Sequence, residues 1–536
     1  MTHYTLTLLD TTGIQNYIFA SNRLQENIGA SELVYRATTL WAFDALEKVV
    51  KSSHNIKNPY SLEWDYQDAA IEKDGALKAE VVQAAGGNTL ILFHSKDDAI
   101  AFVKALTLRL LKDAPGLTVL AQHSDFDFAT GNLFEARQAL ELAMRQHKQT
   151  WLSHAATLGL GVTAVCESTG LPAVNSLAGN IKLAGEQKPE PLGLDGENNE
   201  TLISSEVVAK RAWRSASNER LDKQLRNARD IYFFPYDLEK IGRDKGDESY
   251  LAVVHADGNR MGEQVAKIAQ SATGTRDAIS KLRKFSKQIS RVSLAALERV
   301  VALTVQAAKN QAVPVVCETV KGEERKYLPL RPLVFGGDDL TFVCNGKIGL
   351  ELAAFYMQAF REEAQKDDLD LHASAGVSVV KLHYPFARAY ALAENLIDSA
   401  KSLTRGENCS ALDWHFAQSG LSGSLKHIRE REYLAEDNNP LYRRPLTLEE
   451  WGKVEAVIHK FNEGWARNKA FGLREPLRKG GPAVKKYRQD FELPLLPEIA
   501  GREACKTGWK DGKCYYFDAI ELLDHYVALK SGEGKK

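Results

Sequence analysis

The hexapeptide Phe335-Gly336-Gly337-Asp338-Asp339-Leu340 decides the fold and limits the chemistry that this chain can carry. Apolar residues flank it on both sides and predict two strands, over 332–335 and 340–344, joined by a tight hairpin. Glycine tolerates the backbone conformations of a tight turn and lets a phosphate group approach the main chain. Adjacent acids in a turn can converge on one metal ion, because the two strands hold them on rigid elements. The hexapeptide therefore predicts a metal-binding hairpin, and a solvated acidic turn is the alternative.

A third carboxylate is needed, because phosphoryl-transfer sites usually hold two divalent ions about 3.5–4 Å apart. Asp257 is the candidate, since it ends an apolar strand predicted over 251–256. In a βαββαβ sheet the first and third strands are neighbours, so the end of the first strand faces the hairpin. We therefore predict Asp257, Asp338 and Asp339 as catalytic residues and as ligands of two Mg²⁺ or Mn²⁺ ions, which prefer oxygen ligands.

Nucleotide contacts are predicted around these acids. Residues 257–262 open a helix, whose free backbone N–H groups suit a triphosphate. The residues predicted to contact nucleotide here are Gly258, Asn259, Arg260, Gly262, Gly336 and Gly337.

The βαββαβ order occurs twice along the chain. Asp10 precedes Gly86-Gly87 by 76 residues, and Asp257 precedes Gly336-Gly337 by 79. The first copy continues as Asn88-Thr89, so it lacks both acids of the hairpin. Two copies of one α+β fold, each a ferredoxin-like antiparallel sheet with helices on one face, are the simplest interpretation. One copy is then active and the other inactive.

The rest of the chain divides around these copies. We predict a first ferredoxin-like domain over 1–122, a mostly helical connector over 123–245, a second such domain over 246–415 and a helical C-terminal domain over 416–536. Inside the first domain, helical sequence runs from residue 14 to about 50, with a break at 28–31. Pro, Gly and acidic residues at 185–200 indicate a loop.

Composition excludes several classes of protein. The 536 residues include 69 Lys and Arg against 70 Asp and Glu, so bulk charge does not hold this chain to nucleic acid. Six cysteines without a CxxC pair exclude a disulfide scaffold and indicate a reducing compartment. The sequence predicts no membrane span and a cytoplasmic protein. A basic run at 474–488 is either a contact for a partner or a solvated helix face.

The chain resembles the large, polymerase-like subunit of type III CRISPR–Cas effector complexes, whose palm domains are relatives of GGDEF nucleotide cyclases. The resemblance covers 1–415 and is carried by DTTGIQNYIF at 10–19, NIGASELV at 27–34, ADGNRMG at 256–262, GGDD at 336–339, SAGVS at 374–378, KLHYP at 381–385 and AK at 400–401.

The resemblance implies a nucleotidyltransferase that converts ATP to a cyclic oligoadenylate, a second messenger in antiviral defence. It implies that Lys401 neutralises a phosphate, although a surface lysine at a helix end is the alternative. It also implies that Gln15 and Ser31 contact a second nucleotide from the inactive copy. The two copies can act as an internal dimer, so a monomer or a homodimer is expected.

Three departures from the family bear on these expectations. The first copy starts at residue 4 without a His-Asp dipeptide, which indicates a compact form lacking the nuclease domain. Cys166 stands alone where many members carry a CxxC zinc module. The family's Asp-Gly-Asp is Asp257-Gly258-Asn259 here, which replaces one acid by an amide.

Two other functions stay open. The chain can be a non-catalytic scaffold subunit of a CRISPR-type ribonucleoprotein, with RNA or effector subunits bound through the C-terminal basic run. It can also be a diguanylate-type cyclase that uses GTP, for which Asn259 is a candidate guanine-reading residue.

Overall fold

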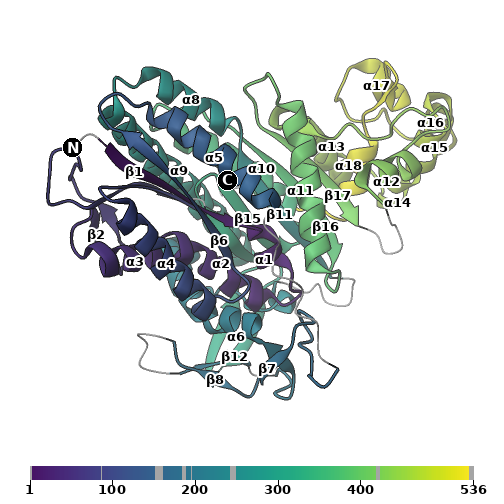
Figure 1. Cartoon of the computed structure of the whole chain (residues 1–536). Coiled ribbons are helices and arrows are strands. Elements are labelled where there is room, and N and C mark those ends of the chain that lie inside the picture. Colours follow the sequence, from purple (N-terminus) through teal and green to yellow (C-terminus); the bar gives the residue numbers. More distant parts are fainter. Residues whose placement is uncertain are drawn as a thin grey trace. The chain divides into compact units, whose positions relative to one another are not determined.

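The structure is a computed structural model, and it describes residues 3–85, 87–150, 161–183, 189–194, 196–241, 249–320, 322–417 and 423–529. The chain forms two compact units, and Figure 1 labels their helices and strands. Unit 1 holds residues 1–226, 260–294 and 333–338, and unit 2 holds 227–259, 295–332 and 339–536. Among the described helices, none is long and apolar enough to cross a membrane.

The first sheet lies in unit 1 and has the strand order β4-β5-β1-β6, with antiparallel neighbours. Its strands are β1 (His3–Thr12), β4 (Ala79–Ala85), β5 (Asn88–Phe93) and β6 (Thr118–Asp127). Asp10 lies opposite Asn88 in the register of β1 and β5. This is the predicted ferredoxin-like order, so the α+β fold class is confirmed for the first copy.

Helices cover both faces of this sheet, so the prediction of helices on one face is wrong. On one face Leu6 and Leu92 join a core with Met144 of α5 (Leu133–Thr150) and with Ile279, at the start of α9 (Thr275–Lys309). On the other face Phe93 stacks on Phe102 of α4 (Lys96–Asp113), with ring centroids 5.5 Å apart. Both faces are covered because nearly every residue of β1, polar ones included, is buried.

The second sheet repeats this arrangement and extends it, with the order β14-β15-β11-β16-β17-β18. Its strands are β11 (Tyr250–Gly258), β14 (Leu330–Gly336), β15 (Asp339–Asn345), β16 (Ala373–Lys381), β17 (Ala411–Ala417) and β18 (Leu446–Thr447). Strands β11, β15 and β16 are antiparallel, whereas β16 and β17 are parallel. The helices α10 (Gly349–Gln365) and α11 (Phe386–Leu403) pack against β16. The sheet therefore runs beyond β16, while the first sheet ends at β6.

The helical stretch after β1 is divided differently from the prediction. It consists of α1 (Ile14–Phe19), α2 (Leu24–Thr38) and α3 (Leu40–Val50), so the break predicted at 28–31 is wrong. Gly29 lies inside α2, where an added Cβ would meet the carbonyl oxygen of Lys210 at 1.6 Å. The glycine therefore lets α6 (Ser205–Ala212) approach α2 closely rather than ending the helix.

The region between the copies is a small β module followed by two helices. Its elements are β7 (Ala173–Ser176), β8 (Asn180–Ile181), β9 (Glu190–Pro191), β10 (Leu202–Ser204), α6 and α7 (Arg214–Arg229). Cys166 lies in a small apolar core with Leu177, Leu192 and Ile203. Residues 151–160, 184–188, 195 and 242–248, which fall in the predicted connector and loop, lie outside the described residues.

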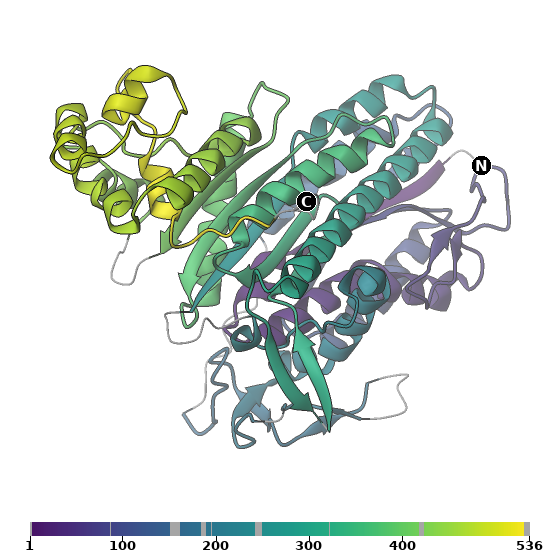
Figure 2. The ribbon, with the colours of Figure 1, turned by 180° about the vertical axis from the view of Figure 1, so that it is seen from behind.

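The remaining elements are short or helical. Unit 2 also contains the two-stranded hairpin of β12 (Val316–Val320) and β13 (Glu323–Tyr327), drawn in teal in Figure 2. The C-terminal elements are α12 (Leu425–Glu432), α13 (Leu448–Gly464), α14 (Arg467–Gly472), α15 (Arg474–Arg478), α16 (Gly481–Asp490), α17 (Arg502–Thr507), β19 (Trp509–Lys510), β20 (Lys513–Cys514) and α18 (Phe517–Leu522). The others are β2 (Ile56–Lys57), β3 (Asp65–Tyr66), the 3₁₀ helix η1 (Leu238–Lys240) and α8 (Met261–Ser271). The predicted helical character of the C-terminal part is thus confirmed, whereas the four domain boundaries stay a prediction.

Candidate active site

The acidic hairpin forms as the sequence predicts. Strand β14 ends at Gly336 and β15 starts at Asp339. Gly336 has φ 138° and Gly337 has φ 66°, a region that side chains with a Cβ rarely adopt. No atom lies within 4 Å of a Cβ built on either glycine, so the backbone conformation and not crowding demands glycine. The turn therefore leaves its main chain open to a ligand.

The hairpin is supported from one side by a residue that the sequence does not single out. Phe335 lies under the guanidinium of Arg220, 4.4 Å from the ring centroid, and both belong to unit 1. Arg220 also donates to Glu32 of α2 at 2.7 Å and is 3% exposed. The guanidinium, fixed by Glu32, therefore holds Phe335 at the start of the turn against α7.

Asp257 lies at the same end of its sheet as Asp339. Ala256 pairs with Leu340 in the register of β11 and β15, so the next position places Asp257 opposite Asp339. On its other side Asp257 pairs with Ser374 of β16. The prediction that the first strand ends beside the hairpin is thus confirmed. Neighbouring positions of an antiparallel pair lie about 4.5–5.5 Å apart at Cα, close enough for two carboxylates to share an ion.

Lys401 of α11 forms an ion pair with Asp257. The Asp257 side chain is 21% exposed and the Lys401 side chain 33% exposed, so the pair is partly shielded from water. The ammonium neutralises the carboxylate that would otherwise repel Asp339. Lys401 is therefore tied to the acidic site and is not merely a surface lysine at a helix end.

His255 lies two residues before Asp257 on β11 and is 7% exposed. Its Nδ1 is 3.0 Å from the Thr341 hydroxyl of β15. Burial lowers the pKa of His255, so the imidazole is neutral near pH 7 and adds no charge beside the acids.

Asn259 anchors a loop through its side-chain amide, which explains why an amide and not a carboxylate stands at this position. Its Nδ2 donates to the Cys409 carbonyl at 3.0 Å, and its N–H donates to the His372 carbonyl at 2.8 Å. A carboxylate could not donate the first of these bonds. The side chain is 7% exposed, and its Oδ1 has no hydrogen-bond partner among the described residues. Asn259 therefore fixes the segment after α11.

The other predicted nucleotide contacts differ in their surroundings. Arg260 has φ 57° at the start of α8 and pairs with Glu263, 2.8 Å from Nε to Oε1. Gly262, in the first turn of α8, has open space where a Cβ would stand. Gln15 is exposed on α1 and Ser31 is buried on α2, both in unit 1. Nucleotide binding by these four residues stays a prediction.

The three aspartates Asp257, Asp338 and Asp339 are suitable ligands for magnesium, since Mg²⁺ binds carboxylate oxygens. Among the described residues, however, no three His, Cys, Asp or Glu side chains are gathered closely enough to hold an ion. Asp338 is half-buried, Asp339 is exposed, and Asp257 is engaged by Lys401. The residue types therefore fit a metal site, but binding requires the carboxylates to turn toward one another.

The first copy carries a matching pair that no sequence motif marks. Lys148 of α5 lies 2.5 Å from Asp10 at the end of β1. Helix α5 follows β6 as α11 follows β16, so the pair corresponds to Lys401 with Asp257. The amide of Asn88 also reaches Asp10, at 2.8 Å with its nitrogen facing the carboxylate. The spacings are a signal that could have found it, since Asp10 precedes Lys148 by 138 residues and Asp257 precedes Lys401 by 144.

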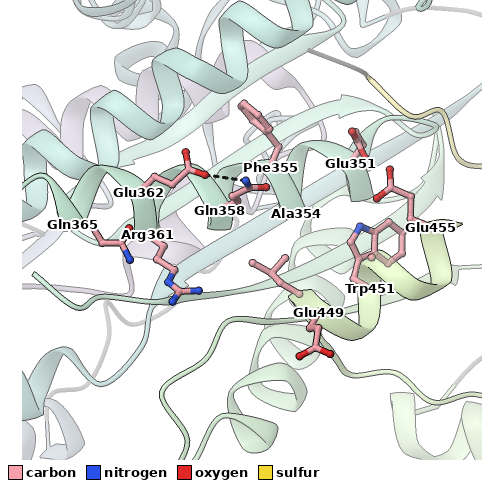
Figure 3. A pocket seen from close by; sticks show the side chains of 12 residues that line it. Glu351, Ala354, Phe355, Gln358, Arg361, Glu362, Gln365, Glu449, Trp451 and Glu455 are labelled. Atoms are coloured by element: carbon pink, nitrogen blue, oxygen red, sulfur yellow. Dashed lines mark hydrogen bonds between the residues drawn. The ribbon is translucent and has the colours of Figure 1, made fainter. Parts of the chain in front are cut away.

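A separate cavity of about 620 Å³ lies between α10 and α13 (Figure 3). Glu351 and Glu455 face each other at one end of it. The Tyr526 hydroxyl is 2.5 Å from Glu351 and 2.9 Å from Glu455, and the Leu529 N–H donates to Glu351 at 3.2 Å. Burial raises the pKa of Glu351 to about 7. These contacts attach the segment after α18 to α10 and α13.

Residues 250–409 match the family model described as Cas10/Cmr2, second palm domain. Among solved structures, chains of the Csm1-Csm4 cassette with cA4 and with pppApA match at 15% and 16% identity, each with a TM-score of 0.55. A chain of the Csm1-Csm4 subcomplex in the type III-A CRISPR-Csm interference complex matches at 16% identity with a TM-score of 0.54. Each match covers 99% of this chain and 70% of the other, and at this identity it shows a shared fold. No curated protein matches the chain.

Proposed function

We propose that this chain, whose residues 250–409 match the second palm domain of Cas10/Cmr2, is a metal-dependent nucleotidyltransferase that makes cyclic oligoadenylate from ATP. The observation that carries the proposal is the register that sets Asp257 opposite Asp339, beside an open glycine turn and the ammonium of Lys401. The similar solved structures of the Csm1-Csm4 cassette are complexes with cA4, pppApA and AMPPNP.

The residues have separate parts in this proposal. Two Mg²⁺ or Mn²⁺ ions held by Asp257, Asp338 and Asp339 would activate the attacking ribose hydroxyl and neutralise charge at the α-phosphate. The Gly336-Gly337 turn gives a phosphate room beside the main chain. Lys401 holds the charge of Asp257 before substrate binds and then offers its ammonium to a phosphate. Asn259 keeps the segment after α11 in place.

The first copy has a different role in the proposed reaction. In strand register Asn88 lies opposite Asp10 as Asp339 lies opposite Asp257, and Lys148 already pairs with Asp10. We therefore propose that this copy holds a second ATP without a metal pair of its own, with contacts from Gln15 and Ser31.

The two rival functions can be weighed against these contacts. A scaffold without activity is favoured by the lack of a gathered three-carboxylate cluster among the described residues. A GTP-specific cyclase is disfavoured, because the candidate guanine reader Asn259 is buried and donates to Cys409. By analogy with the similar structures, which contain Csm4, we propose an effector subunit as a partner.

The test is conversion of each labelled NTP with Mg²⁺, with products resolved by mass. We expect ATP to give cyclic products and pyrophosphate, and Asp338→Ala with Asp339→Ala to abolish both. Glu323→Ala with Glu324→Ala is the matched control, because it also removes two adjacent exposed acids from a hairpin. Full activity of the Asp338/Asp339 variant would refute the site, and inactivity of the intact chain with every nucleotide, also with its partner subunits, would favour the scaffold.

A further inference from the structure

Ser374 of β16 carries a buried hydroxyl that the proposed function does not use. The side chain is 0% exposed, and its Oγ has no hydrogen-bond partner among the described residues. A buried hydroxyl in this position gives up its hydrogen bonds to water and gains none from the protein, which disfavours folding. Ser378 on the same strand shows the ordinary arrangement, because it is equally buried and donates to the Ala389 carbonyl of α11 at 2.7 Å. The hydroxyl of Ser374 therefore needs an explanation.

Ser374 lies on the face of β16 that packs against α11. Residues two apart on a strand point to the same face, so Ser374 shares its face with Gly376. A Cβ built on Gly376 would collide with the backbone of α11, at the Ala393 carbonyl oxygen and the Ile397 nitrogen. Strand and helix run in opposite directions, so the step from Gly376 back to Ser374 leads to the next turn of α11. That turn carries Lys401.

Asp257 stands directly opposite Ser374 in the register of β11 and β16. Opposite residues of an antiparallel pair point to the same face, with their Cβ atoms about 4.5–5.5 Å apart. The ion pair of Asp257 with Lys401 shows that this face is the one toward α11. Asn259, two residues further along β11, has a buried Oδ1 that also lacks a partner among the described residues. Of these two unpartnered oxygens beside the carboxylate, only the serine hydroxyl can donate a hydrogen bond.

We propose that Ser374 is a positioning residue, whose hydroxyl donates to the Asp257 carboxylate and fixes its orientation once Lys401 releases it. A carboxylate that has lost its ammonium partner rotates about its side-chain bonds, and ordering it again weakens metal binding. A donor behind the carboxylate avoids this loss and leaves the lone pairs that face a metal ion free. The inference rests on the proposed function, because it concerns the same carboxylate, and it adds a residue that has no contact with metal or nucleotide.

The test is Mn²⁺ binding to the full chain, followed by the electron paramagnetic resonance signal of free Mn²⁺. Only binding that Asp257→Asn removes is counted as binding at this site. We expect Ser374→Ala to weaken that binding about tenfold, as removal of a residue that orients a metal ligand does. The urea midpoint of the same variant should equal or exceed that of the intact chain, because alanine removes a buried hydroxyl without a partner. A serine needed only for packing would not show this combination.

Two further variants locate the action of the hydroxyl. Ser378→Ala is the matched control, since it removes an equally buried hydroxyl from the same face of β16. It should lower the urea midpoint, because a hydrogen bond to α11 is lost, and leave Mn²⁺ binding within twofold. In the Lys401→Met background, Ser374→Ala should weaken Mn²⁺ binding more than it does in the intact chain, because Asp257 then keeps neither donor. Independent effects of the two substitutions would place the action of the hydroxyl elsewhere and overturn the inference.

Pyrophosphate release from ATP distinguishes failure of this inference from failure of the proposed function. If the intact chain is active and Asp257→Asn loses Mn²⁺, but Ser374→Ala binds Mn²⁺ within twofold of the intact chain, only the inference is overturned. It is also overturned if Ser374→Ala binds less Mn²⁺ and unfolds at a lower urea concentration, since the serine is then structural. If the intact chain is inactive while Ser374→Ala still weakens the binding that depends on Asp257, the inference stands and the cyclase proposal fails. Undiminished Mn²⁺ binding by Asp257→Asn would refute both.

Discussion

Lys401 of α11 and Asp257 at the end of β11 form an ion pair, and Lys148 with Asp10 repeats it in the first copy. Because the same ion pair occurs in both copies, we infer that the lysine is a structural feature of the shared fold and not an incidental residue at a helix end. In the second copy the same carboxylate is a proposed metal ligand, so the ammonium and the metal compete for it.

Removing Lys401 tests this competition. In Lys401→Met the carboxylate of Asp257 is free, so we expect the half-saturating Mg²⁺ concentration to fall about two- to fivefold, which corresponds to a partly exposed ion pair worth up to about 1 kcal/mol. Maximal pyrophosphate release should fall at least tenfold, because a phosphate loses its cation. The measurement is pyrophosphate release over a Mg²⁺ titration. Lys148→Met should leave the Mg²⁺ dependence unchanged, and an unchanged dependence in Lys401→Met would show that the two cations do not compete.

Asp339→Asn installs in the second copy the residue that the first copy has at Asn88. The amide keeps the size of the side chain but removes the charge that would hold a metal ion. We expect pyrophosphate release from ATP to fall at least 100-fold, because metal ions contribute several kcal/mol of charge stabilisation. The unfolding midpoint in urea should stay the same, which separates loss of chemistry from loss of structure. Retention of more than half the activity would exclude Asp339 as a ligand.

One glycine of the turn and one glycine of α8 predict opposite effects of the same substitution. Gly336→Ala places a Cβ at φ 138°, so we expect destabilisation of about 1–2 kcal/mol. Gly262→Ala lies inside α8 with open space around it, so we expect stabilisation of up to about 1 kcal/mol. Urea unfolding of both variants measures the difference. Equal midpoints would show that the turn does not need glycine.

The raised pKa of Glu351 predicts that the folded state loses stability as pH rises. Its folded-state pKa is about 7 against an ordinary 4.5, so between these values the folded state binds a proton that the unfolded state has lost. Stability is therefore lost progressively from pH 4.5 to 7, by about 3 kcal/mol in total. The Tyr526 hydroxyl has one proton for two carboxylates, which agrees with a protonated Glu351. In urea unfolding, Glu351→Gln should match the intact chain at pH 4.5 and exceed it at pH 8.

The control for that experiment is Glu463→Gln, an exposed glutamate on α13. It should change stability little at either pH. If Glu351→Gln is less stable than the intact chain at pH 8, the carboxylate is needed in its charged form and the prediction is wrong.

The sequence predicted the strands and the acidic hairpin well, because local patterns determine both. Short apolar runs mark β11 and β15, and the βαββαβ order then makes the two strands neighbours, which brings Asp257 opposite Asp339. Gly29 shows where local patterns mislead. Its neighbours resemble a helix break, yet the reason for glycine is a backbone contact with Lys210, which is remote in sequence.

Contacts between residues far apart in the chain escape local patterns. Asn259 resembles a lost metal ligand, whereas its donation to Cys409 depends on a loop 150 residues later. Lys148 lies in α5, inside the region predicted as a connector over 123–245. In the structure α5 packs on β1 and β6 of the first copy. Arg220 lies in a polar helix with no motif, and only the fold places it over Phe335.

The unequal ends of the two sheets have a consequence for solubility. Strand β16 is shielded by β17, whereas β6 is the last strand of the first sheet and leaves its outer backbone groups without a neighbouring strand among the described residues. Such an edge can recruit a strand from another molecule and start aggregation. The half of β6 near its C-terminus carries Asp125 and Asp127, and charged side chains on an edge strand oppose that pairing. These carboxylates therefore oppose self-association through the edge of the first sheet.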